Sequence, residues 1–315
     1  MSARPEEPPC TDREREAERT RASGATSARV SVGIATRGRP QHVRSVIAHL
    51  RRQTLAPDAV IVSCVGRDDI GGLEQADAVH VVLGRPGLAR QRNAILDNLP
   101  EDTEIVVFFD DDFYPHDRWL EIAAAAFGAD AKLACLTGNV IADGIGGSGL
   151  TTQAAVRALE AASPDDHLWV IDDYSPYGCN MAFRRAAIAG LRFDEKLVLY
   201  GWLEDRDFGA RVSRARGRLI KLGAALGVHL GVKSGRVSGR RLGYSQVVNP
   251  YYMYRKRTMS ARGAALQVLR NLSANVAKSL WPEPHIDRRG RLAGNLIGFG
   301  DLIVGSCNPE RAEQL

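Results

Sequence analysis

The segment EIVVFFDDDF at residues 104–113 decides the fold class of this chain. Its first half is a nearly continuous run of β-branched and aromatic residues, which is typical of a strand buried on both faces of a parallel sheet. Its second half places Asp110, Asp111 and Asp112 in a row where that strand should end. Adjacent carboxylates repel one another by roughly 1–4 kcal/mol per close pair, depending on how wet the site is. We therefore expect a positive partner beside them.

The three aspartates are candidates for a metal site. In an extended backbone alternate side chains share a face, so Asp110 and Asp112 should point together while Asp111 points away. Two convergent carboxylates suit a hard divalent ion such as Mg²⁺ or Mn²⁺, with open positions left for phosphate oxygens. The competing interpretation is a solvated acidic turn at the N-terminus of a helix. This motif alone does not decide between the two.

Composition indicates a soluble globular protein. Hydrophobic residues make up 44% and charged residues 25% of the 315 residues, which are ordinary values. No apolar run approaches the roughly 20 residues that span a bilayer, and the N-terminus lacks the apolar core of a signal peptide. The five cysteines form no CxxC pair. We interpret them as reduced thiols and expect a cytoplasmic protein.

The net charge of +5 conceals an asymmetry. Acidic residues outnumber basic ones up to Asp205, and basic residues greatly outnumber acidic ones from Arg206 onward. Such a basic C-terminal third indicates contact with something anionic, for which a diphosphate, a membrane surface and nucleic acid are the candidates. A merely solvated Arg-rich surface is the alternative.

The order of the apolar segments predicts a parallel α/β sheet. Residues 1–28 lack apolar periodicity, and we expect a disordered tail there. Further on, strands are expected at 30–35, 59–65 and 79–83, and helices after Pro40 and Gly87. Alternating strands and helices indicate right-handed crossovers, and ligands then bind beyond the carboxyl ends of the strands.

The usual phosphate loops are missing. The sequence has no GxxxxGK[ST] motif, and residues 33–38 do not spell GxGxxG. This disfavours a Walker-type NTPase and a simple dinucleotide enzyme. A helix at 119–127 and a strand at 133–141 should follow the acidic segment, and the Gly-rich residues 142–176 are expected to form a mobile lid or excursion.

Four segments, taken in order, resemble the family 2 glycosyltransferases. Residues 30–40 look like the family's first strand and Thr-containing nucleotide loop, and Asp110 to Asp112 look like its DxD motif. Residues 178–185 are similar to its Gly-x-Asn-x-Ala stretch, and Glu204-Asp205 resembles its ED motif. A fifth segment at 87–93 is similar to its Arg-Asn helix start. The resemblance covers about residues 29–232.

The resemblance implies the GT-A fold, a Rossmann-like, mostly parallel central sheet flanked by helices. The glycosyltransferase domain would span residues 29–232, with a nucleotide-binding half at about 29–113 and an acceptor half at about 114–232. Residues 233–315 would form a basic, mostly helical C-terminal extension.

The resemblance also implies metal-assisted, inverting transfer of a sugar from a nucleotide-diphosphate sugar to an acceptor hydroxyl. Asp112, with help from Asp110, would hold Mn²⁺ or Mg²⁺ and neutralise the leaving diphosphate. The aspartate of the ED motif, Asp205, would take the acceptor proton, with Glu204 beside it, and such a base contributes about 10²–10⁴ in rate. The alternative for this pair is the N-terminus of a helix. His229 would be a third metal ligand or a diphosphate contact, although a lone His is more often structural.

Other residues are candidates for substrate contacts. Thr36, Arg37, Arg39 and the aspartates Asp110 and Asp111 would bind the nucleotide sugar, as would Arg90, Arg92 and Asn93 at their helix start. For these three residues a solvated helix face is the alternative. Asn180 and Trp202 would bind the acceptor, although Trp202 could equally belong to the core.

The sequence departs from the family pattern in two places. Ser63 and Cys64 occupy the position of a base-reading aspartate, with Asp68 and Asp69 a few residues later, so the nucleotide base stays open. The QxxRW signature of processive members is absent, so we expect one transfer per encounter.

The C-terminal extension carries a helical stripe with basic residues among its polar positions: Leu266, Leu269, Leu272, Val276 and Leu280, with Arg262, Arg270 and Lys278. We expect the stripe to pack on the catalytic domain. The alternative is peripheral binding to an anionic membrane, where the enzyme would meet a lipid-linked acceptor in place of a carbohydrate or small-molecule one. Nucleic acid is not an expected partner.

Two other classes of protein compete with this interpretation. A sugar-1-phosphate nucleotidyltransferase also uses acidic metal ligands on a related sheet, but its Gly-rich NTP loop is matched only by the short Arg37-Gly38-Arg39. A non-catalytic membrane or nucleic-acid adaptor on the same fold is the second rival. It is disfavoured because acids are present at both the metal and the base positions.

Overall fold

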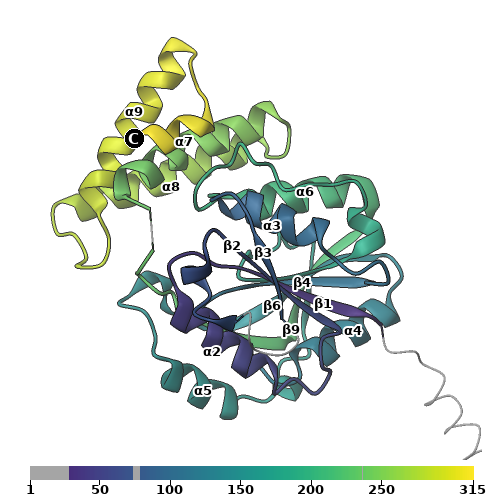
Figure 1. The fold of residues 1–315 in the computed structure, drawn as a ribbon. Helices are drawn as coiled ribbons and strands as arrows, with labels where there is room; N and C mark the ends of the chain where they lie inside the picture. Colours follow the sequence, from purple (N-terminus) through teal and green to yellow (C-terminus); the bar gives the residue numbers. More distant parts are fainter. Residues whose placement is uncertain (1–27, 74–78, 236) are drawn as a thin grey trace, which may run out of the picture.

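The computed structural model describes residues 28–73, 79–235 and 237–315 (Figure 1). The disordered tail predicted for residues 1–28 lies outside the described residues, except for Ala28.

The centre of the protein is one mixed sheet, which in the described residues has nine strands in the order β3-β2-β1-β4-β8-β6-β9-β5, with β7 also paired to β9. The strands are β1 (Val30–Ala35), β2 (Ala59–Cys64), β3 (Val79–Leu83), β4 (Ile105–Asp110), β5 (Phe113–Pro115), β6 (Leu133–Asp143), β7 (Val170–Asp172), β8 (Asn180–Arg184) and β9 (Arg218–His229). Strands β1 to β4 pair in parallel, as do β6 and β9, whereas β5, β7 and β8 run antiparallel to their neighbours. The predicted α/β class with a mostly parallel sheet is confirmed.

Helices cover both faces of the sheet (Figure 1). One face carries α2 (Pro40–Leu50), α4 (Trp119–Ala129) and α5 (Thr152–Glu160), and the other carries α3 (Leu88–Asp97) and α6 (Glu204–Arg216). Strand β4 serves both cores because its side chains alternate: Phe109 packs in the first, and Phe108 in the second. The apolar run in β4 is thus buried on both sides.

Part of the segment that we predicted as a lid has a fixed place. Helix α5 inserts Ala155 and Leu159 into the first core, and β7 pairs with the edge of β9. Only the Gly-rich turn before α5 resembles the predicted excursion.

The C-terminal residues form a helical layer of α7 (Gly239–Arg255), α8 (Ala261–Ser279) and α9 (Arg288–Val304) (Figure 1). Helices α7 and α9 approach closely, since a Cβ on Gly243 would lie 2.0 Å from the carbonyl oxygen of Arg291. Lys256 joins this layer to the sheet domain through ion pairs with Asp194 at 2.6 Å and Asp207 at 2.7 Å.

The predicted packing of the apolar stripe of α8 on the catalytic domain is wrong. Leu269 and Leu280 are 56% and 68% exposed, and α8 turns Ala264 and Asn275 inward instead. The physical reason is a hydrogen bond that holds Asn275 against Asn295 of α9 at 2.9 Å. Among the described residues, no helix is both long and apolar enough to cross a membrane.

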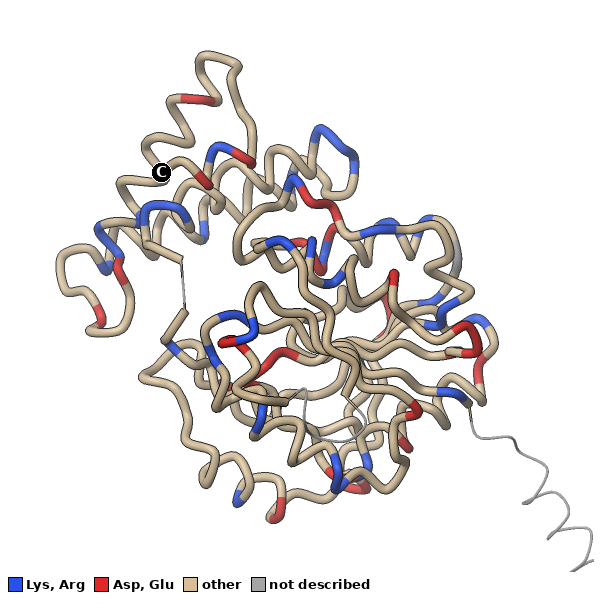
Figure 2. The backbone as a smooth tube through the Cα atoms, in the orientation of Figure 1, with Lys and Arg blue, Asp and Glu red and all other residues tan. Residues whose placement is uncertain are grey.

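Figure 2 shows Lys and Arg spread along the C-terminal helices, which agrees with the charge asymmetry of the sequence.

Candidate active site

The carboxyl ends of several strands meet at one edge of the sheet. Strand β4 ends at Asp110, and β9, which runs in the same direction, ends at His229. Strand β5 begins directly after Asp112 and pairs its first residue, Phe113, with His229. This pairing places Asp112 beside an imidazole that is far away in the sequence. The acids thus lie where ligands bind in sheets of this kind.

Asp110, Asp112 and His229 form a compact group of possible metal ligands. Each offers a ligand atom, and these atoms lie within 4.8 Å of one another. Nε2 of His229 lies 3.3 Å from Oδ1 of Asp112, and Nδ1–H of the same ring donates to Oδ1 of Asp143 over 3.0 Å. The structure therefore brings together the three residues that we predicted as metal ligands, and their role stays a prediction.

These contacts shift the pKa values of both partners. Burial disfavours the charged form of Asp112, but the hydrogen bond and charge of His229 outweigh it and lower the pKa of Asp112 to about 2. Burial also disfavours the His229 cation, yet its bonds to Asp112 and Asp143 raise the pKa of His229 to about 10. Without a metal ion, protonated His229 thus offsets part of the acid charge gathered here, and an ion bound at Nε2 would take the place of that proton.

Asp111 belongs to a different set of contacts. Residues 111 and 112 form a turn and not a strand, so the alternation argument does not hold as stated, although Asp110 and Asp112 do converge. The Thr36 hydroxyl donates to Asp111 Oδ2 at 2.8 Å, and Arg39 Nη1 donates to its Oδ1 at 2.9 Å. Burial, opposed by Arg39, raises the pKa of Asp111 to about 7.

Arg92 connects the metal-ligand group with the second acid pair. Its side chain, only 2% exposed, forms ion pairs with Glu204 and, at 3.2 Å, with Asp110. It also donates to the carbonyl oxygen of Gly178 at 2.8 Å. The N–H of Gly178 in turn donates to Oδ2 of Asp205 at 2.8 Å. Arg92 and Gly178 therefore bridge Asp110 and Asp205.

Asp205 lies in the first turn of α6, where the helix dipole favours a negative charge. Burial raises its pKa, while the N–H groups of Gly178 and Arg206 act in the opposite direction. The thiol of Cys179 has a raised pKa, first because it is buried and then because Asp110, Asp112 and Asp205 all act on it. The backbone joins the two groups here, since the N–H of Asp110 donates to the carbonyl oxygen of Cys179 at 3.1 Å, and the neighbouring Gly178 donates to Asp205.

A cavity of about 830 Å³ opens between this edge of the sheet and the C-terminal helices. Seven of the residues predicted to bind substrates line it: Thr36, Arg37, Arg39, Arg90, Asp110, Asp111 and Trp202. The helical layer contributes Leu242 and Gln246 from α7 and Arg288 and Arg291 from α9. Asp205 and His229 are not among the residues that line it.

Three other predicted residues make their hydrogen bonds within the protein. The Asn93 amide donates to the backbone oxygen of Phe193 at 3.0 Å, and Asn180 Oδ1 accepts from the N–H of Gly138 at 2.7 Å. Glu204 is buried in its ion pair with Arg92. The predicted substrate contacts of Asn93 and Asn180, and the catalytic role of Glu204, stay predictions.

Sequence reasoning missed several residues of the site. Asp143 orients His229, and the hydroxyl of Tyr177 donates to Asp143 Oδ2 at 2.9 Å. Gln91 donates to the backbone oxygens of Thr36 and Ser63, at 2.8 and 2.9 Å, and so fixes the first loop. Asp143 ends β6, but the strand was predicted only to residue 141, so the sequence analysis placed Asp143 in the predicted lid.

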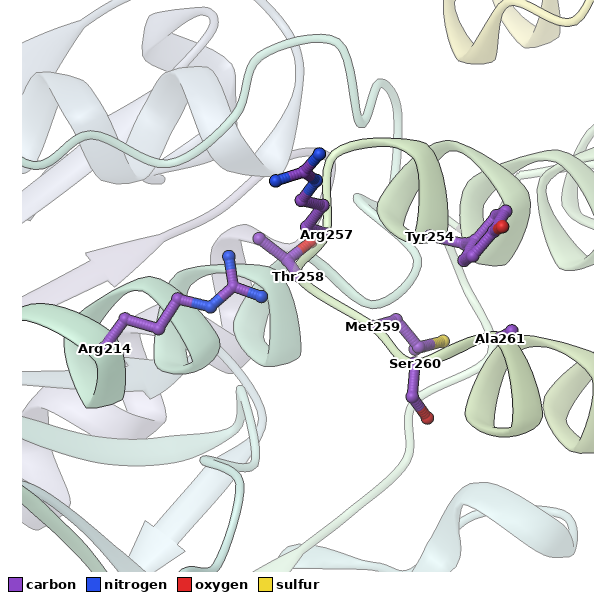
Figure 3. A pocket seen from close by; sticks show the side chains of 7 residues that line it. All are labelled: Arg214, Tyr254, Arg257, Thr258, Met259, Ser260 and Ala261. Carbon is purple, nitrogen blue, oxygen red and sulfur yellow. The ribbon is translucent and has the colours of Figure 1, made fainter.

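A second, smaller hollow of about 270 Å³ lies at the turn between α7 and α8 (Figure 3). Its lining includes Arg257 and, from α6, Arg214. The guanidinium of Arg214 points toward Thr258 (Figure 3). The hollow contains none of the predicted site residues.

A comparison with protein families decides the identity. The profile described as glycosyl transferase family 2 matches residues 31–192, which is just over half of the chain. The chain belongs to glycosyltransferase family 2. This family 2 glycosyltransferase is an enzyme of sugar transfer, which separates it from the nucleotidyltransferases and the non-catalytic adaptors considered above. No curated protein gives a significant match.

Solved structures with low sequence identity share its fold. S. aureus TarS 1-349 is 16% identical with a TM-score of 0.56, and the match covers 91% of this chain and 83% of that one. The same TarS fragment in complex with UDP-GlcNAc is 18% identical with a TM-score of 0.52, over 91% and 83% of the two chains. The mannosyltransferase PcManGT from Pyrobaculum calidifontis, solved with GDP-Man and Mn²⁺, is 16% identical with a TM-score of 0.52, over 89% and 81%. The predicted GT-A fold is confirmed.

Proposed function

We propose that this glycosyltransferase moves a sugar from a nucleoside-diphosphate sugar to an acceptor hydroxyl, with inversion, with a divalent metal ion and with one transfer per encounter. One observation carries the proposal: Arg92 and Gly178 bridge Asp110, a member of the Asp-Asp-His group, and Asp205. An acid group that can hold a cation and a second acid that can accept a proton are the two parts that such a transfer needs.

The donor set fits a divalent metal ion. Two carboxylates suit Mn²⁺ and Mg²⁺, and the imidazole of His229 favours Mn²⁺ of the two. Asp110, Asp112 and His229 would hold the ion, which when bound supplies positive charge to a leaving diphosphate. PcManGT was solved with GDP-Man and Mn²⁺, which supports the same donor chemistry here.

Three basic residues of the cavity are suited to bind the diphosphate of the donor. Arg37, Arg39 and Lys233 line the cavity beside Asp110 and present positive charge to a diphosphate. Lys233 is held in place by the backbone oxygens of Gly144 and Ile145, to which it donates at 3.0 and 2.8 Å. Arg39 is oriented by its bond to Asp111 and needs no further ordering when a donor enters.

Asp205 is the proposed general base. Its raised pKa makes it a better proton acceptor than an ordinary carboxylate, and the N–H groups of Gly178 and Arg206 hold both oxygens in place. Proton removal from the acceptor hydroxyl by Asp205 opposite the leaving group gives attack in line and inversion at the anomeric carbon. Trp202, on the cavity wall two residues before the helix of Asp205, is the proposed acceptor wall.

The proposed organisation keeps residues 29–232 as the catalytic unit and residues 233–315 as a helical layer that closes one side of its cavity. A cytoplasmic location stays a prediction.

Donor turnover tests the proposal. The protein is incubated with UDP-, GDP- and dTDP-sugars and Mn²⁺, and the release of nucleoside diphosphate is measured with and without chelator. We expect one nucleotide class to be used and Asp205→Asn to lower the rate by about 10²–10⁴. Product NMR then gives the anomeric configuration.

Asp165→Asn is the matched control because Asp165 is an exposed acid with one weak ion pair at 3.5 Å. Retention of configuration, or equal turnover by Asp205→Asn and Asp165→Asn, would refute the assignment of Asp205.

A further inference from the structure

The outer side of the C-terminal layer is apolar. Large apolar side chains that are at least half exposed gather on α8, on α9 and directly after α8: Leu266, Leu269, Val276, Leu280, Trp281, Leu296, Ile303 and Val304. Trp281 is 82% and Ile303 is 86% exposed. These residues pack in none of the hydrophobic cores of the described chain. We call Leu266, Leu269, Val276, Leu280, Trp281, Leu296 and Ile303 the outer face.

The spacing of these residues follows helical periodicity. On α8, Leu266, Leu269, Val276 and Leu280 recur at intervals that keep them on one side of the helix. On α9, Leu296 and Ile303 are two turns apart and share a side. Helix α8 thus presents an apolar stripe to the outside, and α9 presents Leu296 and Ile303.

The inner side of the same helices is polar. The Asn275 amide donates to Asn295 at 2.9 Å and to Gln246 of α7 at 2.8 Å, and Arg288 donates to the Asn275 oxygen at 3.2 Å. Asn275 and Asn295 are at most 1% exposed. A helical layer bathed only in water places its apolar side inward and its polar side outward. In this layer the apolar residues face outward and the polar residues face inward, which favours contact of the outer side with an apolar environment.

Basic residues outnumber acidic ones on this layer, in which the acids Glu283 and Asp287 lie between α8 and α9. Helix α8 contains Arg262, Arg270 and Lys278 and no acidic residue. On α9, Arg289 is exposed, whereas Asp301 is buried and accepts from Tyr244 at 2.7 Å. Exposed arginines therefore accompany the apolar stripe of α8, while Glu283 after that helix pairs with Lys278 at 2.5 Å and with Arg288 at 2.9 Å. An apolar stripe flanked by an excess of positive charge is the pattern of a helix that binds anionic lipid.

We propose that the outer face docks on an anionic lipid surface, with α8 and α9 lying in the interface and their arginines at the headgroups. A second copy of the chain suits this face less well, because a symmetric pairing would bring together two surfaces on which basic residues are in excess.

Docking would also orient the cavity. Arg288 and Arg291 of α9 line the cavity from the layer that carries the outer face. A lipid-bound enzyme therefore holds its cavity near the headgroups, where a lipid-linked acceptor would be presented. This last step rests on the proposed function, whereas the docking itself does not.

Vesicle flotation of the full chain tests the proposal. The probes are vesicles of phosphatidylcholine alone and of phosphatidylcholine with phosphatidylglycerol. We expect binding to the anionic vesicles only, with a decrease at high salt. Arg262→Gln and Arg270→Gln should each weaken binding about fivefold.

Leu280→Glu and Leu168→Glu form a matched pair because the two leucines are 68% and 73% exposed, and Leu168 lies in the catalytic domain. We expect Leu280→Glu to abolish flotation and Leu168→Glu to preserve it, with unchanged circular dichroism for both. Release of nucleoside diphosphate from free donor should be the same for both variants, so a failure of docking is distinguishable from a failure of the proposed function.

Three results would overturn the proposal: no flotation of the wild type with anionic vesicles, equal loss of flotation in the two variants, or a dimer in light scattering that Leu280→Glu dissociates. The last result would assign the outer face to a second copy.

Discussion

Replacing Arg92 by Met should destabilise the protein strongly. The substitution keeps the bulk of the stem of Arg92 but leaves the carboxylate of Glu204, whose side chain is 3% exposed, without its cation. The second oxygen of Glu204 has no hydrogen-bond partner among the described residues, so only the N-terminus of α6 remains to offset the charge. Removal of one partner of a buried ion pair costs about 3–5 kcal/mol. We expect the free energy of unfolding to fall by about this amount.

Urea unfolding followed by circular dichroism measures the loss. The double variant Arg92→Met/Glu204→Gln removes the stranded charge and should recover part of the stability. Arg90→Met is the control on the same helix, because Arg90 pairs at 3.0 Å with Glu313, which is 40% exposed. Such a pair contributes about 0–1 kcal/mol.

A loss below about 1 kcal/mol for Arg92→Met would refute this reasoning, because it would show that Glu204 is solvated or protonated. An intact stability with a raised KM for the nucleotide sugar would instead support the donor contact that the sequence predicted for Arg92.

Three further predictions concern other parts of the chain. Asp143→Asn should weaken Mn²⁺ binding, measured by electron paramagnetic resonance of free Mn²⁺, by about 10–100-fold, because His229 loses the carboxylate that orients it. His49→Gln should flatten the loss of stability between pH 7 and 5. Burial lowers the pKa of His49, so below about 6.5 the unfolded chain binds a proton that the folded wild type does not. Lys256→Met should lower the free energy of unfolding in urea by about 1.5–3 kcal/mol, because it removes a charged hydrogen bond from Asp207, which is fully buried.

Each of these predictions has a control. Asp172→Asn, far from His229 on an exposed strand, should leave Mn²⁺ affinity unchanged, and equal affinities of Asp143→Asn and the wild type would contradict the orienting role. His42→Gln should retain the pH slope, and a slope that His49→Gln leaves intact would exclude His49 as its source. Lys196→Met replaces a lysine near Asp194, and a loss equal to that of Lys256→Met would contradict the ion pairs seen here.

The sequence predicted the elements that local patterns determine. The apolar run of β4 and the breakers around it were sufficient to place the acids at the carboxyl edge of a parallel sheet. We predicted a role for His229 at this edge because it follows a Gly- and Leu-rich segment that is typical of a strand. The contact between Asp143 and His229 was not predicted because it depends on strand register. Strands β6 and β9 pair in parallel so that Asp143 lies directly opposite His229. No local pattern shows that these two strands are neighbours.

The ion pair between Arg92 and Glu204 was not predicted from the sequence for the same reason. Arg92 was a candidate for a nucleotide-sugar contact and Glu204 for a catalytic role, since charged residues at helix starts near a ligand edge are usually solvated or functional. In the structure the charges of Arg92 and Glu204 neutralise one another, because helices α3 and α6 cover the same face of the sheet and begin at the same edge. Pairing of opposite charges across two helices is a property of packing, and sequence spacing does not contain it.

The apolar stripe of α8 shows a different limit. Periodicity correctly placed Leu266, Leu269 and Leu280 on one side of a helix, but it does not give the direction in which that side faces. The direction was decided by Asn275, which is buried with Asn295 because two amides can satisfy one another inside the layer. The sequence shows only that Asn275 lies opposite the apolar stripe, as a polar residue does on any amphipathic helix. Its burial and its bond to Asn295 are visible only in the structure.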